Sequence, residues 1–261
     1  MPLNIRTYHE LTEADRSGLG EQIAAQRRRV ALRMASVRRV LAVLSGKGGV
    51  GKSFVTAGLA RALARSGRAT GVLDADFNGP TAPQMLHLPV ASCTLHSEVI
   101  EPAVSPEGVR CFSMGLLLEE GRPLAFRGPE AEGHVWRGTL EAAALREFLA
   151  DVAWGTLDDL LVDLPPGVQR FSELVELLPG PPSVLAVTIP TPESHEAVRR
   201  AVRGATERGA NLLGVVENMV GGGFSGTAGD DLAREFGVPV LARIPWHPTP
   251  DTWDELAGRL G

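Results

Sequence analysis

Cysteine, lysine and long apolar runs are all scarce in this chain. The shortage of cysteine and of long apolar runs excludes two classes of protein, and the few lysines are confined to one loop. Cysteine occurs only as Cys93 and Cys111 in 261 residues, which rules out a disulfide framework and favours a reducing compartment. No apolar stretch is long enough to span a bilayer, and the N-terminus lacks the pattern of a signal peptide. We therefore expect a cytoplasmic protein without a membrane partner.

Positive charge is also in short supply. Lysine and arginine together number 26 against 31 aspartate and glutamate residues, which gives a formal net charge of −5. This balance does not favour non-specific binding to nucleic acid, so no nucleic-acid partner is expected. Apolar residues make up 44% of the chain, as is usual for a globular protein.

Lysine occurs only at Lys47 and Lys52, and both lie in the loop sequence SGKGGVGKS of residues 45–53. Arginine is used instead of lysine everywhere else, which indicates that this loop needs a compact ammonium group rather than a planar guanidinium. From Gly46 onward the loop fits the phosphate-binding pattern G-x-x-x-x-G-K-[ST]. The residues expected to bind nucleotide here are Gly46, Gly48, Gly49, Val50, Gly51, Lys52 and Ser53.

Each residue type in this loop suits phosphate chemistry. Glycine lets backbone N–H groups turn toward an anion without a Cβ clash. Lys52 is expected to reach the β- and γ-phosphates as a catalytic residue, and the Ser53 hydroxyl is expected to bind Mg²⁺. An apolar run over residues 40–44 precedes the loop and a helical apolar pattern follows over residues 55–63, so a helix N-terminus also faces the phosphates.

Beyond residue 38, short apolar runs alternate with helical patterns. The runs are continuous, as in parallel strands that are covered on both faces. One helix is expected to begin at Thr191-Pro192 and to end at Arg208-Gly209, and another to start near Thr139. This series predicts a doubly wound, mostly parallel α/β sheet with ligands at the carboxyl ends of its strands. The expected strands are Val40–Leu44, Ala69–Leu73, Val109–Met114, Leu160–Leu164, Ser183–Ile189, Leu212–Glu217 and Val240–Ile244.

Residues 1–37 are predicted to be an arginine-rich helical extension ahead of a single domain over residues 38–261. We favour a solvated helix that packs on the edge of this domain. The alternative is a basic docking surface for an acidic partner, in which case deleting residues 1–37 abolishes the binding of that partner. The arginines concerned are Arg27, Arg28, Arg29, Arg33, Arg38 and Arg39.

Carboxylates follow two of the expected strands. Asp163 ends an apolar strand, as a Walker B carboxylate does when it serves Mg²⁺, although an aspartate here also suits a helix cap or a turn. Asp74 and Asp76 are two residues apart and are expected to face the same side of one strand. One of them would orient the attacking water and the other would complete the metal shell, and the spacing does not say which.

Lys47 is not needed by an ordinary phosphate loop. From the start of the loop it does not easily reach phosphates that the same loop binds. We therefore expect it to act as a catalytic residue across a dimer interface, where it stabilises transition-state charge as an arginine finger does in trans. The alternative is a surface lysine without a role, and the scarcity of lysine argues against it.

Several segments between residues 38 and 261 together match a known family. They are Ser45–Ser53, Asp74–Thr81, Ser113–Gly115 with Arg122-Pro123 and Arg127–Pro129, Asp163–Gly167, Val216–Met219 and Gly237–Pro245. In this order they resemble the Mrp/ApbC iron–sulfur cluster carriers, which are SIMIBI-class ATPases with a deviant Walker A motif. The phosphate loop alone equally fits relatives of MinD, ParA or nitrogenase reductase.

The resemblance implies a homodimer that sandwiches two ATP molecules and hydrolyses them slowly with Mg²⁺. It assigns Lys47 to the partner subunit's nucleotide and Asp76 to the attacking water. Ser53 and Asp163 would serve Mg²⁺, and Asn218 would bind the adenine, because an amide offers both a donor and an acceptor. Members of the family also carry a Cys-x-x-Cys soon after Glu-Asn-Met, and two such pairs bridge one [4Fe–4S] cluster.

Three departures from the family pattern bear on function. Phe54 stands where the family has threonine, so a hydroxyl for the α-phosphate is missing and weaker nucleotide binding is expected. The family's switch II ends in Thr-Gly-Asp, whereas Val168-Gln169-Arg170 follow Gly167 here, which leaves the coupling of that loop open. After Met219 the chain continues through Val220–Gly226 without a cysteine, although iron–sulfur clusters require thiolate or, rarely, imidazole ligands.

These departures leave three hypotheses: a cluster-free, nucleotide-gated adaptor, a cluster carrier with ligands from Cys93, Cys111 or a partner, and a ParA/MinD-like positioning ATPase. The two cysteines are 18 residues apart and are best interpreted as small buried side chains. His87 and His96 near Cys93 fit no metal-site spacing. The acidic residues 251–256 argue against a membrane-targeting helix.

Overall fold

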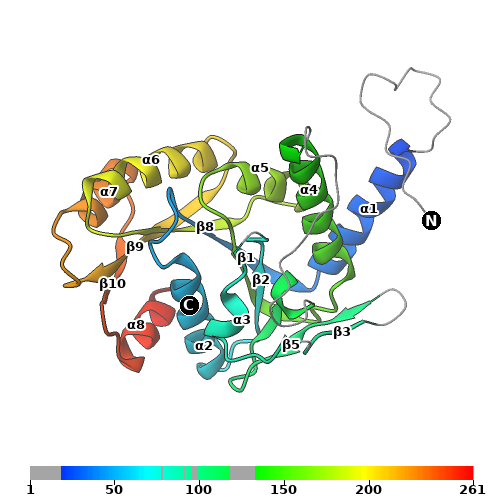
Figure 1. Cartoon of the computed structure of the whole chain (residues 1–261), viewed down its shortest axis with the longest axis horizontal. Helices are drawn as coiled ribbons and strands as arrows, with labels where there is room; N and C mark the ends of the chain where they lie inside the picture. Colours follow the sequence, from blue (N-terminus) through cyan, green and yellow to red (C-terminus); the bar gives the residue numbers. More distant parts are fainter. Residues whose placement is uncertain (1–18, 78, 91, 96–98, 118–132, 261) are drawn as a thin grey trace.

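The computed structural model describes residues 19–77, 79–90, 92–95, 99–117 and 133–260 (Figure 1). Its centre is an eight-stranded sheet in the order β10-β9-β8-β1-β7-β2-β6-β5. Neighbouring strands run parallel, except that β5 pairs antiparallel with β6 at the edge. The strands are β1 Val37–Leu44, β2 Thr70–Asp74, β5 Ala103–Val104, β6 Arg110–Phe112, β7 Leu157–Asp163, β8 Ser183–Thr188, β9 Asn211–Val220 and β10 Val240–Pro245.

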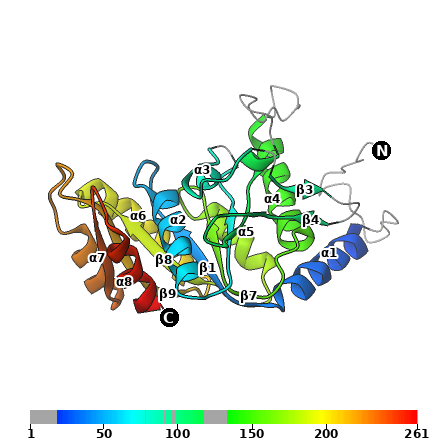
Figure 2. The same ribbon diagram turned by 90° about the horizontal axis from the view of Figure 1, so that it is seen from below.

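Helices cover both faces of this sheet (Figure 2). Successive residues of β1 serve opposite cores, because side chains alternate along a strand. Leu41 packs with α2, α3 and α8 on one face, and Ala42 packs with α1, α4, α5 and α6 on the other, while α7 joins α6 over the β9 side. The helices are α1 Leu19–Met34, α2 Lys52–Arg65, α3 Ala82–Met85, α4 Gly133–Asp151, α5 Gln169–Leu177, α6 Pro192–Thr206, α7 Ala228–Phe236 and α8 Pro250–Leu260.

The α/β class and the mostly parallel sheet predicted from the sequence are confirmed, and each expected strand is found. The helix expected from Thr191-Pro192 is α6, and the Thr191 hydroxyl caps it by accepting from the N–H of Ser194. Several elements were not anticipated, namely the helices α3, α5 and α7, the edge strand β5 and a separate antiparallel ribbon of β3 Thr94–Leu95 and β4 Ile100–Glu101. The short strands leave no pattern in the sequence. The helix expected to start near Thr139 is α4, which begins earlier, at Gly133.

Within the segment predicted as a helical extension, α1 packs against α4. Val30 and Met34 are buried against α4, and the Arg33 Nε donates to the carbonyl of Ala150 at 3.1 Å. Arg29 forms an ion pair with Asp151 at the end of α4. Residues 1–18 lie outside the described part of the chain, so the division at residue 37 and the docking alternative stay predictions.

Candidate nucleotide-binding site

The phosphate loop connects β1 to α2 at the carboxyl edge of the sheet, and its backbone conformation depends on glycine. Gly49 and Gly51 have φ of +79° and +76°, in the left-handed region that other residues rarely adopt. Gly51 is also the N-cap of α2. The first N–H groups of a helix have no partner within the helix, so those of α2 face the loop as donors for an anion.

Gly46 has a packing reason as well as a phosphate-binding one. A Cβ on Gly46 would lie 2.0 Å from the carbonyl carbon of Ala197 and 2.2 Å from the nitrogen of Val198, both in the backbone of α6. The loop therefore rests directly on a helix from the second half of the chain. A glycine-rich pattern indicates where backbone turns sharply, but it does not reveal such a contact.

Lys52 and Asp163 form a buried ion pair at the centre of the site. The Lys52 side chain is 6% exposed, and its Nζ lies 2.5 Å from Oδ1 of Asp163, the last residue of β7. The Thr56 hydroxyl donates to the same oxygen at 3.0 Å. Asp163 Oδ2 is buried and has no hydrogen-bond partner among the described residues, so it presents an unsatisfied acceptor next to the loop.

Asp74 ends β2 and organises the loop that follows it. Its Oδ1 accepts from the N–H of Asp76 at 3.2 Å, and its Oδ2 accepts from the N–H of Ala82 at 3.2 Å and from the Ser113 hydroxyl at 3.1 Å. Burial, together with the nearby charge of Asp163, raises the pKa of Asp74 to about 7.

Asp76 does not share a strand face with Asp74, and that expectation was wrong. The strand β2 ends at Asp74, so Asp76 lies on the loop beyond it, where its carbonyl accepts from the N–H of Gly79 at 3.3 Å. The N–H of Ala75 still donates to the carbonyl of Asp163, whereas the N–H of Asp76 turns back onto the Asp74 carboxyl. Two-residue spacing places side chains on one face only where the strand continues.

Lys47 contrasts with Lys52. Its side chain is half-buried at the start of the phosphate loop, and within the described residues its ammonium group has no hydrogen-bond or ion-pair partner. The only polar contact of Lys47 in that part of the chain is made by its carbonyl, which accepts from the Ser45 hydroxyl at 3.2 Å. One lysine of the loop is thus neutralised inside the chain and the other is not.

Asn218 lies on β9 and is tied to the phosphate loop. Its Nδ2 donates to the carbonyl of Val50 at 2.9 Å, and a Cβ on Gly51 would approach the same nitrogen to 2.3 Å. The next residue, Met219, has φ of +58°, which is uncommon for a residue other than glycine. The sequence indicated an adenine contact for Asn218 but gave no sign of this tie, because the two residues are 168 positions apart.

The loop after β7 lies next to the phosphate loop, at the carboxyl ends of the strands. Gly167 has φ of +95°, and its N–H donates to the carbonyl of Ser45 at 2.9 Å, so this loop is linked to the phosphate loop. The backbone then enters α5, where Arg170 is buried between Glu141 of α4 and Phe77, which follows Asp76. The structure thus brings Lys47, Lys52, Asp74, Asp76, Asp163 and Asn218 to one edge of the sheet.

Known proteins are similar to this chain in sequence and in fold. A family model described as the NUBPL iron-transfer P-loop NTPase, within the ParA group, matches residues 36–256. The chain belongs to this family of iron-transfer P-loop NTPases. Among its relatives, an iron–sulfur cluster carrier protein of Saccharolobus solfataricus is 36% identical over 243 residues, which cover 88% of this chain and 79% of the relative. The cytosolic Fe-S cluster assembly factor NUBP2 of Rattus norvegicus is 39% identical and 82% of each chain is covered.

Solved structures similar to this chain have the same type of fold. The nucleotide-binding protein of Archaeoglobus fulgidus in complex with ADP superposes with a TM-score of 0.69 at 30% identity, covering 89% of this chain and 92% of that one. The cell division ATPase MinD of Pyrococcus furiosus gives a TM-score of 0.58 at 20% identity, covering 85% and 98%, which shows a shared fold. The chain thus has the MinD/ParA type of fold that the sequence predicted.

The loop after β9 is rich in glycine and contacts an aromatic side chain. Gly221 and Gly223 have φ of +77° and +85°. A Cβ on Gly222 would lie 2.3 Å from the ring of Trp246, so the indole is in close contact with this loop. Phe224 and Trp246 are both exposed. The segment that the resemblance associates with two cysteines therefore offers no metal ligand of that kind.

The cysteines lie elsewhere in the NTPase. Cys111 is in the middle of β6 and is fully buried, whereas Cys93 is half-buried with its Sγ 4.0 Å from the carbonyl of Cys111. Burial raises the pKa of both thiols, which disfavours the thiolate that binds metal. Over the described ranges, no group of three or more histidine, cysteine, aspartate and glutamate side chains is arranged to hold a metal ion. This supports the interpretation of Cys111 as a small buried side chain.

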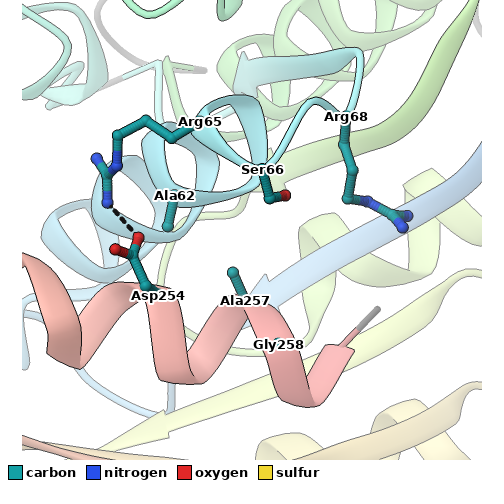
Figure 3. Close-up of a pocket in the computed structure, with 7 residues that line it drawn as sticks. All are labelled: Ala62, Arg65, Ser66, Arg68, Asp254, Ala257 and Gly258. Carbon is teal, nitrogen blue, oxygen red and sulfur yellow. Dashed lines mark hydrogen bonds and ion pairs between the residues drawn. The ribbon is translucent and has the colours of Figure 1, made fainter.

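A separate cavity of about 520 Å³ lies at the end of the sheet opposite the phosphate loop, between the end of α2 and α8 (Figure 3). Arg65 points across it to Asp254, with Nη2 2.6 Å from Oδ1. Arg68, at its other end, pairs with the buried Asp159. These cations are already neutralised, and no residue of the phosphate loop lines the cavity. As for membranes, none of the described helices is both long and apolar enough to cross one.

Proposed function

We propose that this iron-transfer P-loop NTPase binds and slowly hydrolyses Mg·ATP as a homodimer in which Lys47 completes the partner's site. The observation that carries the proposal is the contrast between the two lysines of the loop. Lys52 is neutralised by Asp163, whereas the Lys47 ammonium has no counter-ion in the described part of the chain. A cation in that position suits an anion that comes from outside the chain, such as a nucleotide held by a second copy.

Two residues, one at the start of α2 and one at the end of β7, fit a magnesium ion. Ser53 and Asp163 supply oxygen, the ligand that Mg²⁺ prefers, and the buried Asp163 Oδ2 has no partner among described residues. When bound, Mg²⁺ would neutralise charge on the β- and γ-phosphates. Asp74 is a poorer ligand because both of its oxygens already accept hydrogen bonds, so we assign it to positioning the loop after β2.

The other roles follow from the same edge of the sheet. The backbone N–H groups of Gly46–Gly51 and the start of α2 would hold the phosphates, with Lys52 turning from Asp163 toward them. Asp76 would orient the attacking water from the loop after β2. One N–H of the Asn218 amide holds Val50, and its other N–H and its oxygen would bind adenine.

Mixing two inactive variants tests whether Lys47 acts in trans. Lys47→Ala should lose turnover but keep ATP binding, and Lys52→Ala should lose binding. In a mixed dimer, the Lys47→Ala subunit keeps Lys52 and therefore binds ATP. The Lys52→Ala subunit keeps Lys47 and supplies it to that nucleotide, so this one site is complete. Since half of the dimers in an equal mixture are mixed and each has one complete site, about a quarter of the parent ATPase rate should return.

Two tags, one on each variant, verify that mixed dimers form. Mixed dimers without activity would show that Lys47 does not act across the interface. Lys47→Arg should restore little activity, since a planar guanidinium does not replace a compact ammonium there. A Lys47→Ala variant that hydrolyses ATP at the parent rate would remove any catalytic role for this lysine.

For the cargo, we infer that this chain does not bridge a [4Fe–4S] cluster with its own cysteines and that it acts as a nucleotide-gated adaptor in a reducing, cytoplasmic setting. The loop after β9 has no thiol, and Cys111 would have to leave the core to reach a second copy. A carrier with relocated ligands is the second candidate, because the relatives include proteins named iron–sulfur cluster carriers.

Anaerobic reconstitution with iron and sulfide separates these two functions. The adaptor predicts no stoichiometric cluster by absorbance and iron analysis, with nucleotide binding intact. A cluster that the Cys93→Ser/Cys111→Ser variant loses would instead establish a carrier. Salt-sensitive pelleting with DNA or liposomes in the presence of ATP would favour a positioning ATPase over both.

A further inference from the structure

Arg170 is a buried cation at the junction of two loops of the nucleotide edge. It lies in the first turn of α5, only 6% exposed, three residues after Gly167. Its guanidinium forms ion pairs with Glu141 of α4 and with Glu173 one turn along α5. Its Cζ also lies 5.2 Å from the centre of the Phe77 ring, within the range of a cation–π contact.

Phe77 anchors the loop after β2. It directly follows Asp76, and its ring meets Phe148 of α4 edge-on, with the centroids 5.6 Å apart at 88°. Phe148 in turn packs against Phe112 of β6 at 4.5 Å. The residue next to the proposed water-orienting carboxylate is therefore fixed to α4 by an aromatic cluster.

One face of α4 thus holds both loops. Glu141 and Phe148 are seven residues apart, which is close to two helical turns, so they project from the same side of the helix. Glu141 holds Arg170 in the first turn of α5, directly after the loop that follows β7, and Phe148 holds Phe77 of the loop after β2. The contact of Arg170 with Phe77 closes this arrangement, because it joins the two loops directly.

Stability does not explain an arginine at this position. A cation in the first turn of a helix opposes the helix dipole, and a buried ion pair is often no more stable than apolar residues of similar volume. The Arg170 Nε is moreover buried without a hydrogen-bond partner in the part of the chain that the structure describes. Departures of this kind from local rules are expected where geometry serves function.

We propose that Arg170 is a positioning residue that couples the loop after β7 to the loop after β2 and so places Asp76 for hydrolysis. The inference rests on the proposed ATPase function. When Asp163 and Gly167 respond to Mg·ATP, the start of α5 moves with them, and Arg170 passes that movement to Phe77 and its neighbour Asp76. Arg170 would thereby connect the two loops without touching the nucleotide.

Steady-state kinetics on Arg170→Met, Phe77→Leu and their combination test the coupling. Each single variant should lower kcat about tenfold while KM and the affinity for a non-hydrolysable ATP analogue change less than about twofold. Because both changes break one connection, the double variant should be no slower than the slower single variant. Arg170→Lys keeps the charge but loses the planar group, so it should recover part of the rate.

Arg146→Met is the matched control. It also removes an arginine from this region, here from α4 itself, but Arg146 donates to Gln26 of α1 rather than to either loop, so kcat should stay at the parent value. Multiplicative effects of Arg170→Met and Phe77→Leu would overturn the coupling, as would an Arg170→Met variant with parent kcat. Thermal unfolding of each variant establishes that it is folded.

Hydrogen exchange separates this inference from the proposed function. Mg·ADP should protect the backbone of residues 75–82 from exchange in the parent, and Arg170→Met should lose this protection while still binding Mg·ADP. A parent that binds and protects but does not hydrolyse ATP would contradict the ATPase and leave the coupling intact. A parent and an Arg170→Met variant with equal protection would contradict the coupling alone.

Discussion

The phosphate loop and the loop after β7 are neighbours at one edge of the sheet, but they are built by different means. The phosphate loop takes its shape from glycine conformations and from close backbone contact with α6. The loop after β7 is held through side chains, chiefly Arg170 with Glu141 and Phe77. Gly167 donates to the carbonyl of Ser45 and links the two loops.

The two loops therefore differ in how freely their residues can be substituted. A loop built from backbone has few acceptable sequences where its glycines meet a steric limit, as Gly46 does by contact and Gly49 and Gly51 do by positive φ. A loop held by side chains is replaceable as a set, provided that the new residues pack and pair with one another. The chain keeps the family pattern in the first loop and departs from it in the second.

Lys52→Ala should produce the largest effect. It removes the phosphate-binding ammonium and leaves Asp163 buried and unpaired, so we expect nucleotide affinity to fall more than about a hundredfold and unfolding free energy to fall by about 3 kcal/mol. Calorimetric titration with Mg·ADP and urea denaturation measure the two losses. Lys47→Ala is the control, since it should change stability by less than about 0.5 kcal/mol. Equal losses of nucleotide affinity and of unfolding free energy in Lys52→Ala and Lys47→Ala would show that the two lysines do not differ in this way.

Gly46→Ala should come next. The added Cβ would lie 2.0 Å from the backbone of Ala197, which cannot move without shifting α6, so unfolding free energy should fall by about 2–4 kcal/mol. Gly48→Ala is the matched control, because its nearest neighbour is 3.9 Å away and its φ is not positive. Urea denaturation should show a loss below about 1 kcal/mol for Gly48→Ala. A tolerated Gly46→Ala would mean that the loop is less constrained by backbone contact than the structure indicates.

Phe54→Thr, at the residue that follows the phosphate loop, should have the smallest effect. Phe54 is 36% exposed and meets Trp253 edge-on at 5.3 Å. Compared with Phe54→Val, which lacks the hydroxyl, Phe54→Thr should bind ATP about three to ten times more tightly. Both variants should lose about 1 kcal/mol of stability with the aromatic contact. Equal affinity of the two variants would show that a hydroxyl here does not reach the nucleotide.

Much of the site was predictable because its signals are local. The glycine and lysine pattern of residues 46–53 indicated the loop, and continuous apolar runs indicated parallel strands with ligands at their carboxyl ends. The placement of Asp76 was wrong because its N–H turns back onto Asp74 and ends the strand, and a spacing rule does not contain that bend.

The sequence by itself determined the fold class, the phosphate loop and the family, since each rests on residue types at short spacing. Only the tertiary structure decided what connects them. The Gly46 contact with α6, the tie of Asn218 to Val50 and the Arg170 contacts with Phe77 and Glu141 join residues that are far apart in the chain. No local pattern specifies such contacts, because they depend on how the sheet orders its strands and packs its helices.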